Sequence, residues 1–155
     1  MRYAVSGAAK LVPDVAELFE ALGVVIIKGY GLTECTTVAA INRPDRHRVG
    51  NVGPPVPGVE LRIAADGGIL VRGGNVFAGY HLDEAGAREV LDAEGWLRTG
   101  DVGSIDADGF LTITDRKKDI IVTSEGENVP PQRLETALRA SPYVSGALVV
   151  GDGRP

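Results

Sequence analysis

Residues 29–34 read Gly-Tyr-Gly-Leu-Thr-Glu, and residues 95–101 read Gly-Trp-Leu-Arg-Thr-Gly-Asp. The first stretch combines a flexible backbone with an aromatic ring, a hydroxyl and a carboxylate, and the second presents a carboxylate in a glycine-bounded turn. A nucleotide site needs these groups: a flat surface for the base, an acceptor for the ribose hydroxyls, a donor to phosphate and an oxygen ligand for Mg²⁺. Short motifs also match by accident, and the glycines could simply let the chain turn, so the interpretation depends on the rest of the chain.

The residues before the first stretch favour an α/β arrangement. Pro13 begins an apolar stripe with the period of a helix, and Gly23 ends it. Residues 24–27 are Val-Val-Ile-Ile, which predicts a strand buried on both faces, as in a parallel sheet. We therefore expect the glycine loop to follow a strand end directly, where α/β proteins commonly place their ligands.

The middle of the chain predicts a small β-rich unit. Alternating apolar residues around Asp66-Gly67 indicate a hairpin, and a second hairpin surrounds Asp108-Gly109. Between the two hairpins, residues 83–91 predict a short helix with Asp83 as its cap.

The last part of the chain follows a charged joint at residues 115–119. It predicts a strand at residues 120–122, a polar loop at residues 124–129, a helix that begins near Pro131 and a final strand at residues 147–150.

Composition excludes several classes of function. The 155-residue chain has a formal charge of −5, which argues against broad nucleic-acid binding. No apolar run approaches the roughly 20 residues that span a bilayer. The single cysteine, Cys35, cannot form an internal disulfide and is expected to be a small buried residue, so a cytoplasmic location fits best. His47 and His81 are isolated, without the spacing of a metal site.

Motifs in a fixed order extend the pattern, at residues 6–9, 29–34, 69–80, 95–101 and 115–119. This series resembles the adenylate-forming superfamily of acyl-CoA synthetases, amino-acid adenylation domains and firefly-type luciferases. The resemblance implies a mixed α/β (α+β) fold. Residues 1–114 would end the large AMP-binding domain, including a small β-rich subdomain, residues 115–119 would be the hinge, and residues 120–155 would begin the small C-terminal domain.

The resemblance also implies a reaction and its cofactors, ATP or AMP, Mg²⁺ and CoA. A carboxylate and ATP would form an acyl-adenylate with release of pyrophosphate. A thiol, usually that of CoA, would then take the acyl group and release AMP. The small domain would rotate between these two half-reactions.

Nucleotide contacts are implied for the residues that match the family's motifs: Ser6, Gly7, Ala8, Gly29, Tyr30, Gly31, Thr33, Asp101 and Arg116. Among these, Tyr30 matches the aromatic residue that stacks on adenine, and Thr33 matches a hydroxyl that contacts phosphate. Asp101 matches the carboxylate that accepts both ribose hydroxyls, and Arg116 matches the arginine that also reaches the ribose.

Further roles are implied outside the adenosine contacts. Glu34 matches the Mg²⁺ ligand, and together with Thr33 it is an implied catalytic residue. Lys118 matches the hinge position. The loop of Gly126, Glu127 and Asn128 matches the segment that lines the CoA side of the site. Glu125 departs from the pattern, because many relatives have a second glycine there, so the conformation of this loop could differ.

Several of these residues have a plainer interpretation. Asp101 could be an ordinary turn residue, and the basic residues of the joint could be a solvated linker, which we prefer for Lys117. Trp96 and Tyr80 are expected to be packing residues.

Two lysines of the family are expected to lie outside this chain. The family's phosphate-binding loop, which ends in Lys, would lie upstream of Ser6, and its C-terminal lysine would lie beyond Pro155. Because electrostatic stabilisation of the phosphoryl group is a large catalytic term, we expect a C-terminal segment of a longer ligase that binds adenine nucleotide weakly and turns over nothing alone. Its missing N-terminal part would be one of its partners.

Residues 115–122 read Asp-Arg-Lys-Lys-Asp-Ile-Ile-Val and look most like long-chain fatty acyl-CoA synthetases. The expected small-molecule partners are a fatty acid, ATP and CoA, without nucleic acid, and peripheral membrane association of the full enzyme stays open. A fatty acyl-AMP ligase or an amino-acid adenylation domain that loads a carrier protein is an alternative. A noncatalytic nucleotide-binding module is another.

Overall fold

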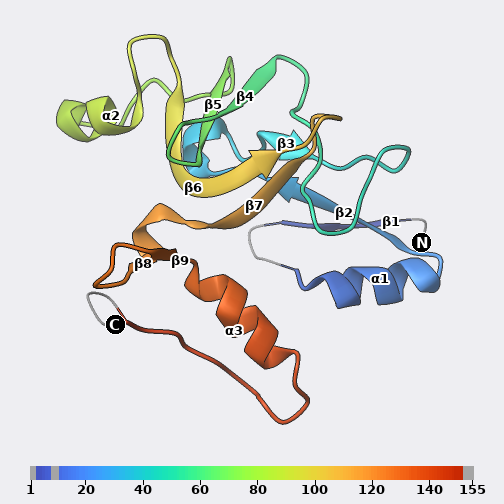
Figure 1. The fold of residues 1–155 in the computed structure, drawn as a ribbon. Coiled ribbons are helices and arrows are strands. Elements are labelled where there is room, and N and C mark those ends of the chain that lie inside the picture. Colours follow the sequence, from blue (N-terminus) through green and yellow to red (C-terminus); the bar gives the residue numbers. More distant parts are fainter. Residues whose placement is uncertain (1–2, 8–10, 152–155) are drawn as a thin grey trace.

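The computed structural model describes residues 3–7 and 11–151, and these form helices and three small sheets (Figure 1). In chain order the elements are β1 (Tyr3–Ser6), α1 (Pro13–Ala21), β2 (Val25–Tyr30), the 3₁₀ helix η1 (Thr33–Cys35), β3 (Ala40–Ile41), β4 (Val59–Ile63), β5 (Gly68–Gly73), α2 (Glu84–Val90), β6 (Leu97–Ile105), β7 (Leu111–Arg116), the 3₁₀ helix η2 (Lys117–Asp119), β8 (Ile121–Val122), β9 (Asn128–Val129) and α3 (Pro131–Arg139). The strand orders are β1-β2-β3, β4-β5-β6-β7 and β8-β9. The chain therefore has the expected mixed α/β fold.

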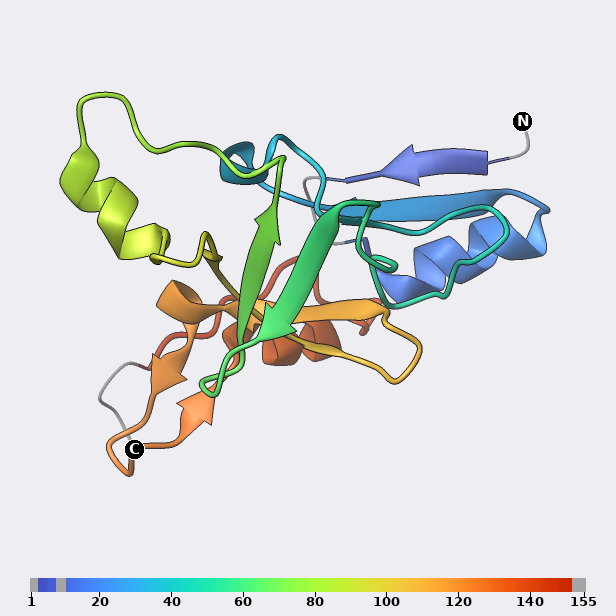
Figure 2. The same ribbon diagram turned by 90° about the horizontal axis from the view of Figure 1, so that it is seen from above.

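The first sheet is built around a parallel pair. β1 and β2 are parallel, and α1 connects them and lies along the pair (Figures 1 and 2). The helix begins with Pro13 in its first turn, where the missing N–H costs no hydrogen bond, and Gly23 follows its end with a φ of +78°. This confirms the predicted helix. Most of its apolar stripe stays exposed, by 39% for Val15 and up to 69% for Leu22 at the C-cap, whereas Ala16 is buried.

The predicted strand at residues 24–27 exists, but it is longer and less buried than expected. β2 continues through Gly29 and Tyr30, so the glycine motif begins within the strand instead of following it. Ile27 is buried, whereas Val25 and Ile26 are half-buried. β1 pairs along one edge of β2, while β3 pairs only with Gly29 and Tyr30 on the other edge.

The second sheet is the predicted β-rich unit. β4, β5, β6 and β7 pair antiparallel in that order, and the hairpin turns fall at Asp66-Gly67 and Asp108-Gly109, as predicted. α2 also forms as predicted, because the Asp83 carboxylate accepts a hydrogen bond from the Gly86 N–H at 2.9 Å. The guanidinium groups of Arg62 and Arg72 lie 4.4 and 4.5 Å from the centroid of the Trp96 ring, and Trp96 is buried, so it is a packing residue as expected.

One turn geometry recurs in both hairpins of this sheet, before β6 and between β8 and β9. In each turn, a glycine N–H donates to the carbonyl three residues earlier, as Gly67 does to Ala64. The N–H of that earlier residue donates to the carbonyl of the residue that follows the glycine, as Ala64 does to Gly68. The glycines have φ between +79° and +82°, a conformation that side chains with a Cβ disfavour. The glycines that do this are Gly67, Gly95, Gly109 and Gly126.

The last part of the chain forms the predicted helix but lacks one predicted strand. α3 begins at Pro131, as expected. The loop at residues 124–129 is a tighter turn than predicted, because β9 pairs with β8 across it. Residues 147–150 do not form a strand, because no described strand pairs with them. The Val149 N–H instead donates to the Glu135 carboxylate of α3 at 3.1 Å.

The core joins the first sheet to the second. Its buried members from the second sheet include Ile69, Val71, Leu97 and Leu111, and they form one cluster with Tyr30 of β2 and with other buried residues. The packing of β2 against the β-rich sheet therefore fixes the carboxyl end of β2 relative to β6 and β7.

None of the described helices has the length and the apolar character needed to cross a membrane.

Truncation of Leu111 tests the position of this core. Leu111 has 0% exposure, so Leu111→Ala should lower the free energy of unfolding by about 2–5 kcal/mol through lost burial and a cavity. Leu148→Ala is the matched control, because Leu148 is 81% exposed and its truncation should change stability by less than about 0.5 kcal/mol. Urea unfolding followed by circular dichroism measures both, and equal effects of the two variants would contradict the assignment.

Candidate nucleotide-binding site

The carboxyl ends of β1 and β2 lie side by side. Ser6 is the register partner of Lys28, and a Cβ built on Gly7 would lie 3.9 Å from the Gly29 carbonyl oxygen. The structure therefore brings together Ser6, Gly7 and Gly29 at one edge of a parallel pair, where α/β proteins bind ligands. Ala8, which was predicted with them, lies outside the described residues.

A buried hydrogen bond connects the two stretches that the sequence analysis singled out. The Tyr30 hydroxyl donates to Oδ2 of Asp101 at 2.7 Å, across 71 residues of sequence. Tyr30 is only 8% exposed, and burial, reinforced by the nearby Asp101 carboxylate, raises the pKa of its phenol well above the ordinary value. The phenol therefore stays protonated and remains a donor to Asp101. Its predicted stacking on adenine stays a prediction.

Asp101 does not lie in a turn, as the sequence suggested, but within β6. Its register partner in β7 is Arg116, whose Nε lies 3.3 Å from Oδ1 of Asp101. The Asp101 N–H donates to the Thr99 hydroxyl at 3.1 Å, which holds the backbone beside a bulge at Val102. Strand pairing, not a glycine turn, thus places the guanidinium against the carboxylate.

The Asp101 carboxylate keeps acceptor capacity for a ligand. A carboxylate has about four lone-pair sites, and Tyr30 and Arg116 each occupy one oxygen from one direction. The side chain of Asp101 is 12% exposed, whereas that of Arg116 is 57% exposed. A nearly buried carboxylate that is already oriented by two partners can accept further hydrogen bonds with little loss of side-chain freedom.

The loop after β2 is compact because Gly31 has no side chain. A Cβ at Gly31 would lie 1.9 Å from the Thr37 carbonyl oxygen. Thr36 and Thr37 have φ of 51° and 76°, which is unusual for β-branched residues. Between these positions, Thr33 and Glu34 form the first turn of η1, and Thr33 is exposed. Close packing therefore requires glycine at position 31, and its predicted contact with the nucleotide stays a prediction.

The segment after β5 holds this loop in place. The Asn75 amide donates to the carbonyls of Cys35 and Val38, at 3.0 and 2.9 Å, and the Phe77 N–H donates to the Glu34 carbonyl at 2.8 Å. Cys35 is fully buried, as expected, and burial raises the pKa of its thiol. The sequence analysis missed the role of Asn75, because its contacts lie 37 to 40 residues away in sequence.

Tyr80 packs on Phe77 as expected, and it also makes a contact that the sequence did not indicate. It was expected to be a packing residue, yet it is 39% exposed and its hydroxyl donates to Oε1 of Glu34 at 2.9 Å. This hydrogen bond to the carboxylate raises the pKa of Tyr80. The ring of Tyr80 also packs edge-to-face on Phe77, with centroids 4.8 Å apart.

Glu34 fits the role of a single protein ligand for Mg²⁺. Within residues 3–7 and 11–151, no group of three or more His, Cys, Asp and Glu side chains forms a metal cage. Mg²⁺ commonly binds one or two carboxylates and completes its shell with phosphate oxygens and water, so a lone, partly exposed carboxylate next to a nucleotide site suits it. Metal binding by Glu34 stays a prediction.

The charged joint at residues 115–119 contacts a turn of the second sheet. Lys117, for which that interpretation was preferred, donates to Oδ2 of Asp66 at 2.6 Å, in the turn between β4 and β5. Lys118 lies next to it in η2 and is exposed. Our preference for Lys117 was therefore wrong, because the turn of a sheet distant in sequence supplies its partner.

The loop predicted for the CoA side is a tight hairpin. Gly126 has a φ of +81°, and the Glu127 N–H donates to the Thr123 hydroxyl at 3.1 Å. Glu125, which stands where a second glycine is common, is not among the described residues with a positive φ, so it fits this turn without strain. Glu127 and Asn128 are exposed, and their contact with CoA stays a prediction.

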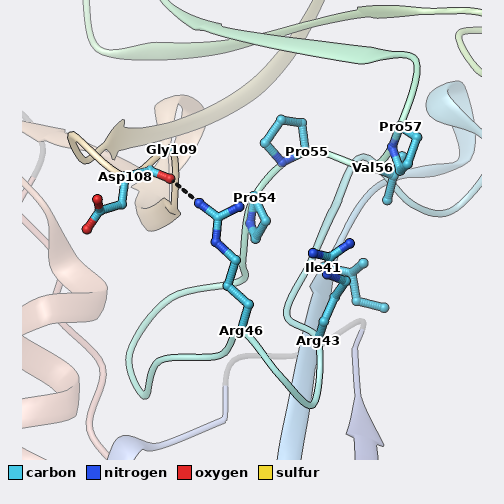
Figure 3. Close-up of a pocket in the computed structure, with 9 residues that line it drawn as sticks. All are labelled: Ile41, Arg43, Arg46, Pro54, Pro55, Val56, Pro57, Asp108 and Gly109. Atoms are coloured by element: carbon cyan, nitrogen blue, oxygen red, sulfur yellow. Dashed lines mark hydrogen bonds between the residues drawn. The ribbon is translucent and has the colours of Figure 1, made fainter.

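A cavity of about 370 Å³ lies apart from these residues (Figure 3). Pro54, Pro55 and Pro57 line it together with Arg43 and Arg46, and the Arg46 guanidinium donates to the Asp108 carbonyl at 2.7 Å. None of the predicted nucleotide contacts lines this cavity. We place the site at Asp101 because charged and aromatic groups converge there, whereas the cavity is an opening between two surface turns.

Comparison with known proteins identifies the family of the chain. A family profile described as "AMP-binding enzyme" matches residues 1–81, and one described as "AMP-binding enzyme C-terminal domain" matches residues 118–155. The chain is 51% identical over 154 residues to long-chain-fatty-acid–CoA ligase FadD15 of Mycobacterium bovis, covering 99% of this chain and 26% of that protein. It is 40% identical over 154 residues to long-chain-fatty-acid–CoA ligase ACSBG1 of Mus musculus, covering 96% of this chain and 21% of that protein.

Solved structures of other enzymes share the fold of this chain. The o-succinylbenzoate CoA synthetase MenE from Bacillus subtilis, in complex with its acyl-adenylate intermediate, superposes with a TM-score of 0.90 at 30% identity, covering all of this chain and 34% of that one. ATP-bound MatB from Rhodopseudomonas palustris gives a TM-score of 0.86 at 34% identity, covering 94% of this chain and 31% of that one. The chain thus spans about a fifth to a third of the length of these relatives.

Gly31→Ala tests the compact loop. The added methyl group would overlap the Thr37 carbonyl, so the backbone must shift, and we expect a loss of about 1–3 kcal/mol in the free energy of unfolding. Gly146→Ala is the matched control, because a Cβ there meets nothing within 4 Å. Thermal and urea unfolding of both variants measures the difference, and a Gly31→Ala variant as stable as its control would show that the loop is not packed in this way.

The Lys117–Asp66 contact predicts an acidic titration. The hydrogen bond from Lys117 lowers the pKa of Asp66 below its ordinary value of 3.8. Since the pKa is lowered in the folded state, the stabilisation is present above the unfolded pKa and is lost as the pH falls through the folded one. A carboxyl ¹³C NMR titration should therefore give Asp66 a midpoint below 3.8 that rises in Lys117→Met and not in Lys118→Met. An unchanged midpoint in Lys117→Met would exclude the contact in solution.

Proposed function

Because this chain belongs to the AMP-binding enzyme family, we propose that it is the part of an AMP-forming acyl-CoA ligase that holds adenosine monophosphate and carries the hinge. The observation that supports this most is the Asp101 carboxylate, which lies between the Tyr30 hydroxyl and the Arg116 guanidinium. A nearly buried, oriented acceptor beside an exposed guanidinium suits a ribose with two adjacent hydroxyls.

In the proposed reaction, a carboxylate oxygen of the acid attacks the α-phosphorus of ATP and pyrophosphate leaves. The sulfur of a thiol then attacks the acyl carbon of the adenylate, and AMP leaves. Asp101 would hold the ribose through both steps, and the exposed Thr33 hydroxyl would donate to phosphate. Mg²⁺, when bound at Glu34, would neutralise charge on the phosphate oxygens.

We propose a long-chain fatty acid as the substrate and CoA as the acceptor, in a cytoplasmic enzyme. The names of the relatives that are 40% to 51% identical support the acid, since they are long-chain-fatty-acid–CoA ligases. A carrier protein is the alternative acceptor. Acyl-adenylate formed by a longer protein that includes this chain, and then offered CoA or carrier protein, would distinguish the two.

Calorimetric titration of AMP into Asp101→Asn tests the proposed site. The substitution removes the charge that would strengthen the hydrogen bonds to ribose, so we expect AMP affinity to fall by about tenfold or more. Asp45→Asn is the matched control, because the Asp45 side chain is 77% exposed in a loop away from the site, and it should leave the affinity unchanged. Equal affinities of Asp101→Asn and the unmodified chain would contradict the proposed function.

A further inference from the structure

The Glu34 carboxylate accepts a hydrogen bond from a residue that is distant in sequence. The Tyr80 hydroxyl donates to Oε1 of Glu34 at 2.9 Å, and 46 residues separate the two. Glu34 lies in η1 and Tyr80 lies between β5 and α2, so only the tertiary fold brings them together.

The surrounding contacts fix Tyr80 before any ligand binds. The segment that carries it is attached to the loop of Glu34 by the Phe77 N–H, which donates to the Glu34 carbonyl at 2.8 Å, and by the Asn75 amide. The ring of Tyr80 packs edge-to-face on Phe77 at 4.8 Å. The hydroxyl is therefore presented to the carboxylate by groups that do not depend on it.

The exposure of Tyr80 argues against a role in packing alone. Tyr80 is 39% exposed, and the hydrogen bond to Glu34 is itself exposed, so neither group needs the other to avoid an unsatisfied buried polar atom. The tyrosine instead restricts the orientation of the carboxylate. A phenol is a neutral donor that brings no positive charge to the carboxylate, and Tyr80 bonds to Oε1 and not to Oε2.

We propose that Tyr80 is a positioning residue that orients the Glu34 carboxylate to bind the divalent cation of the metal–nucleotide complex. This rests on the proposed function. Because the described residues form no group of three or more His, Cys, Asp and Glu side chains that could hold a metal, no cage of such ligands fixes the geometry of Glu34, and the hydrogen bond from Tyr80 restricts it instead. The hydroxyl acts through Glu34 and does not touch the cation.

The test measures how much Mg²⁺ increases the affinity of the chain for ATP. ATP affinity is measured by calorimetry with Mg²⁺ and again with a chelator in its place, and AMP affinity is measured with the chelator. In Tyr80→Phe we expect the Mg²⁺-dependent gain in ATP affinity to fall by about tenfold, as when the partner of a metal ligand is removed. AMP affinity and the melting temperature should stay unchanged, because the ring still packs on Phe77. In Tyr80→Phe, the electron paramagnetic resonance spectrum of bound Mn²⁺–ATP should be broader or weaker than in the unmodified chain.

Two variants accompany this one. Tyr143→Phe is the matched control, because Tyr143 is 95% exposed, and it should behave like the unmodified chain. Glu34→Gln should lose the same Mg²⁺-dependent gain, and combining it with Tyr80→Phe should add no further loss, since both changes act on one carboxylate.

Each other outcome has a definite meaning. If Glu34→Gln loses the gain and Tyr80→Phe keeps it, the positioning role is wrong and the proposed function stands. If Tyr80→Phe lowers AMP affinity and the melting temperature together, Tyr80 is structural and the inference is overturned. If Glu34→Gln keeps the gain, the metal role of both residues is excluded. A failure of the proposed function is distinguishable from these outcomes, because Asp101→Asn would then leave the AMP affinity unchanged.

Discussion

The contact between Tyr30 and Asp101 is the interaction on which the site depends. It joins β2 of the parallel sheet to β6 of the antiparallel sheet through a buried 2.7 Å hydrogen bond. Removing one partner would leave the other polar group buried without its partner, which costs more than the hydrogen bond contributes. The carboxylate also contacts Arg116, the last residue of β7, so one side chain connects β2, β6 and β7.

Around this contact, two segments far apart in sequence hold each other in place. The loop after β2 has left-handed conformations at Thr36 and Thr37, and Asn75 and Phe77 bond to its carbonyls. Strained backbone of this kind persists only where its surroundings over-determine it, and it is common at ligand sites. The orientation of Glu34 is thus set by the packing of another segment on its loop.

Much of the fold could be predicted because local chemistry decides it. Helix α1 has an apolar stripe between Pro13 and Gly23, and each hairpin turn has a glycine at the position that needs a positive φ. Prediction failed where the partner was remote. Residues 147–150 have strand propensity but no described strand beside them. Lys117 was expected to be part of a solvated linker, but it donates a hydrogen bond to Asp66, 51 residues earlier in the sequence.

The sequence by itself determined the types of element, their turns and the set of chemically capable residues, because these follow from side chains a few positions apart. The tertiary structure alone decided that Asp101 lies in a strand opposite Arg116, that Tyr30 donates to it, and that Tyr80 faces Glu34. Strand register and the packing of loops set those contacts. Both depend on groups that are tens of residues apart, which no local pattern records.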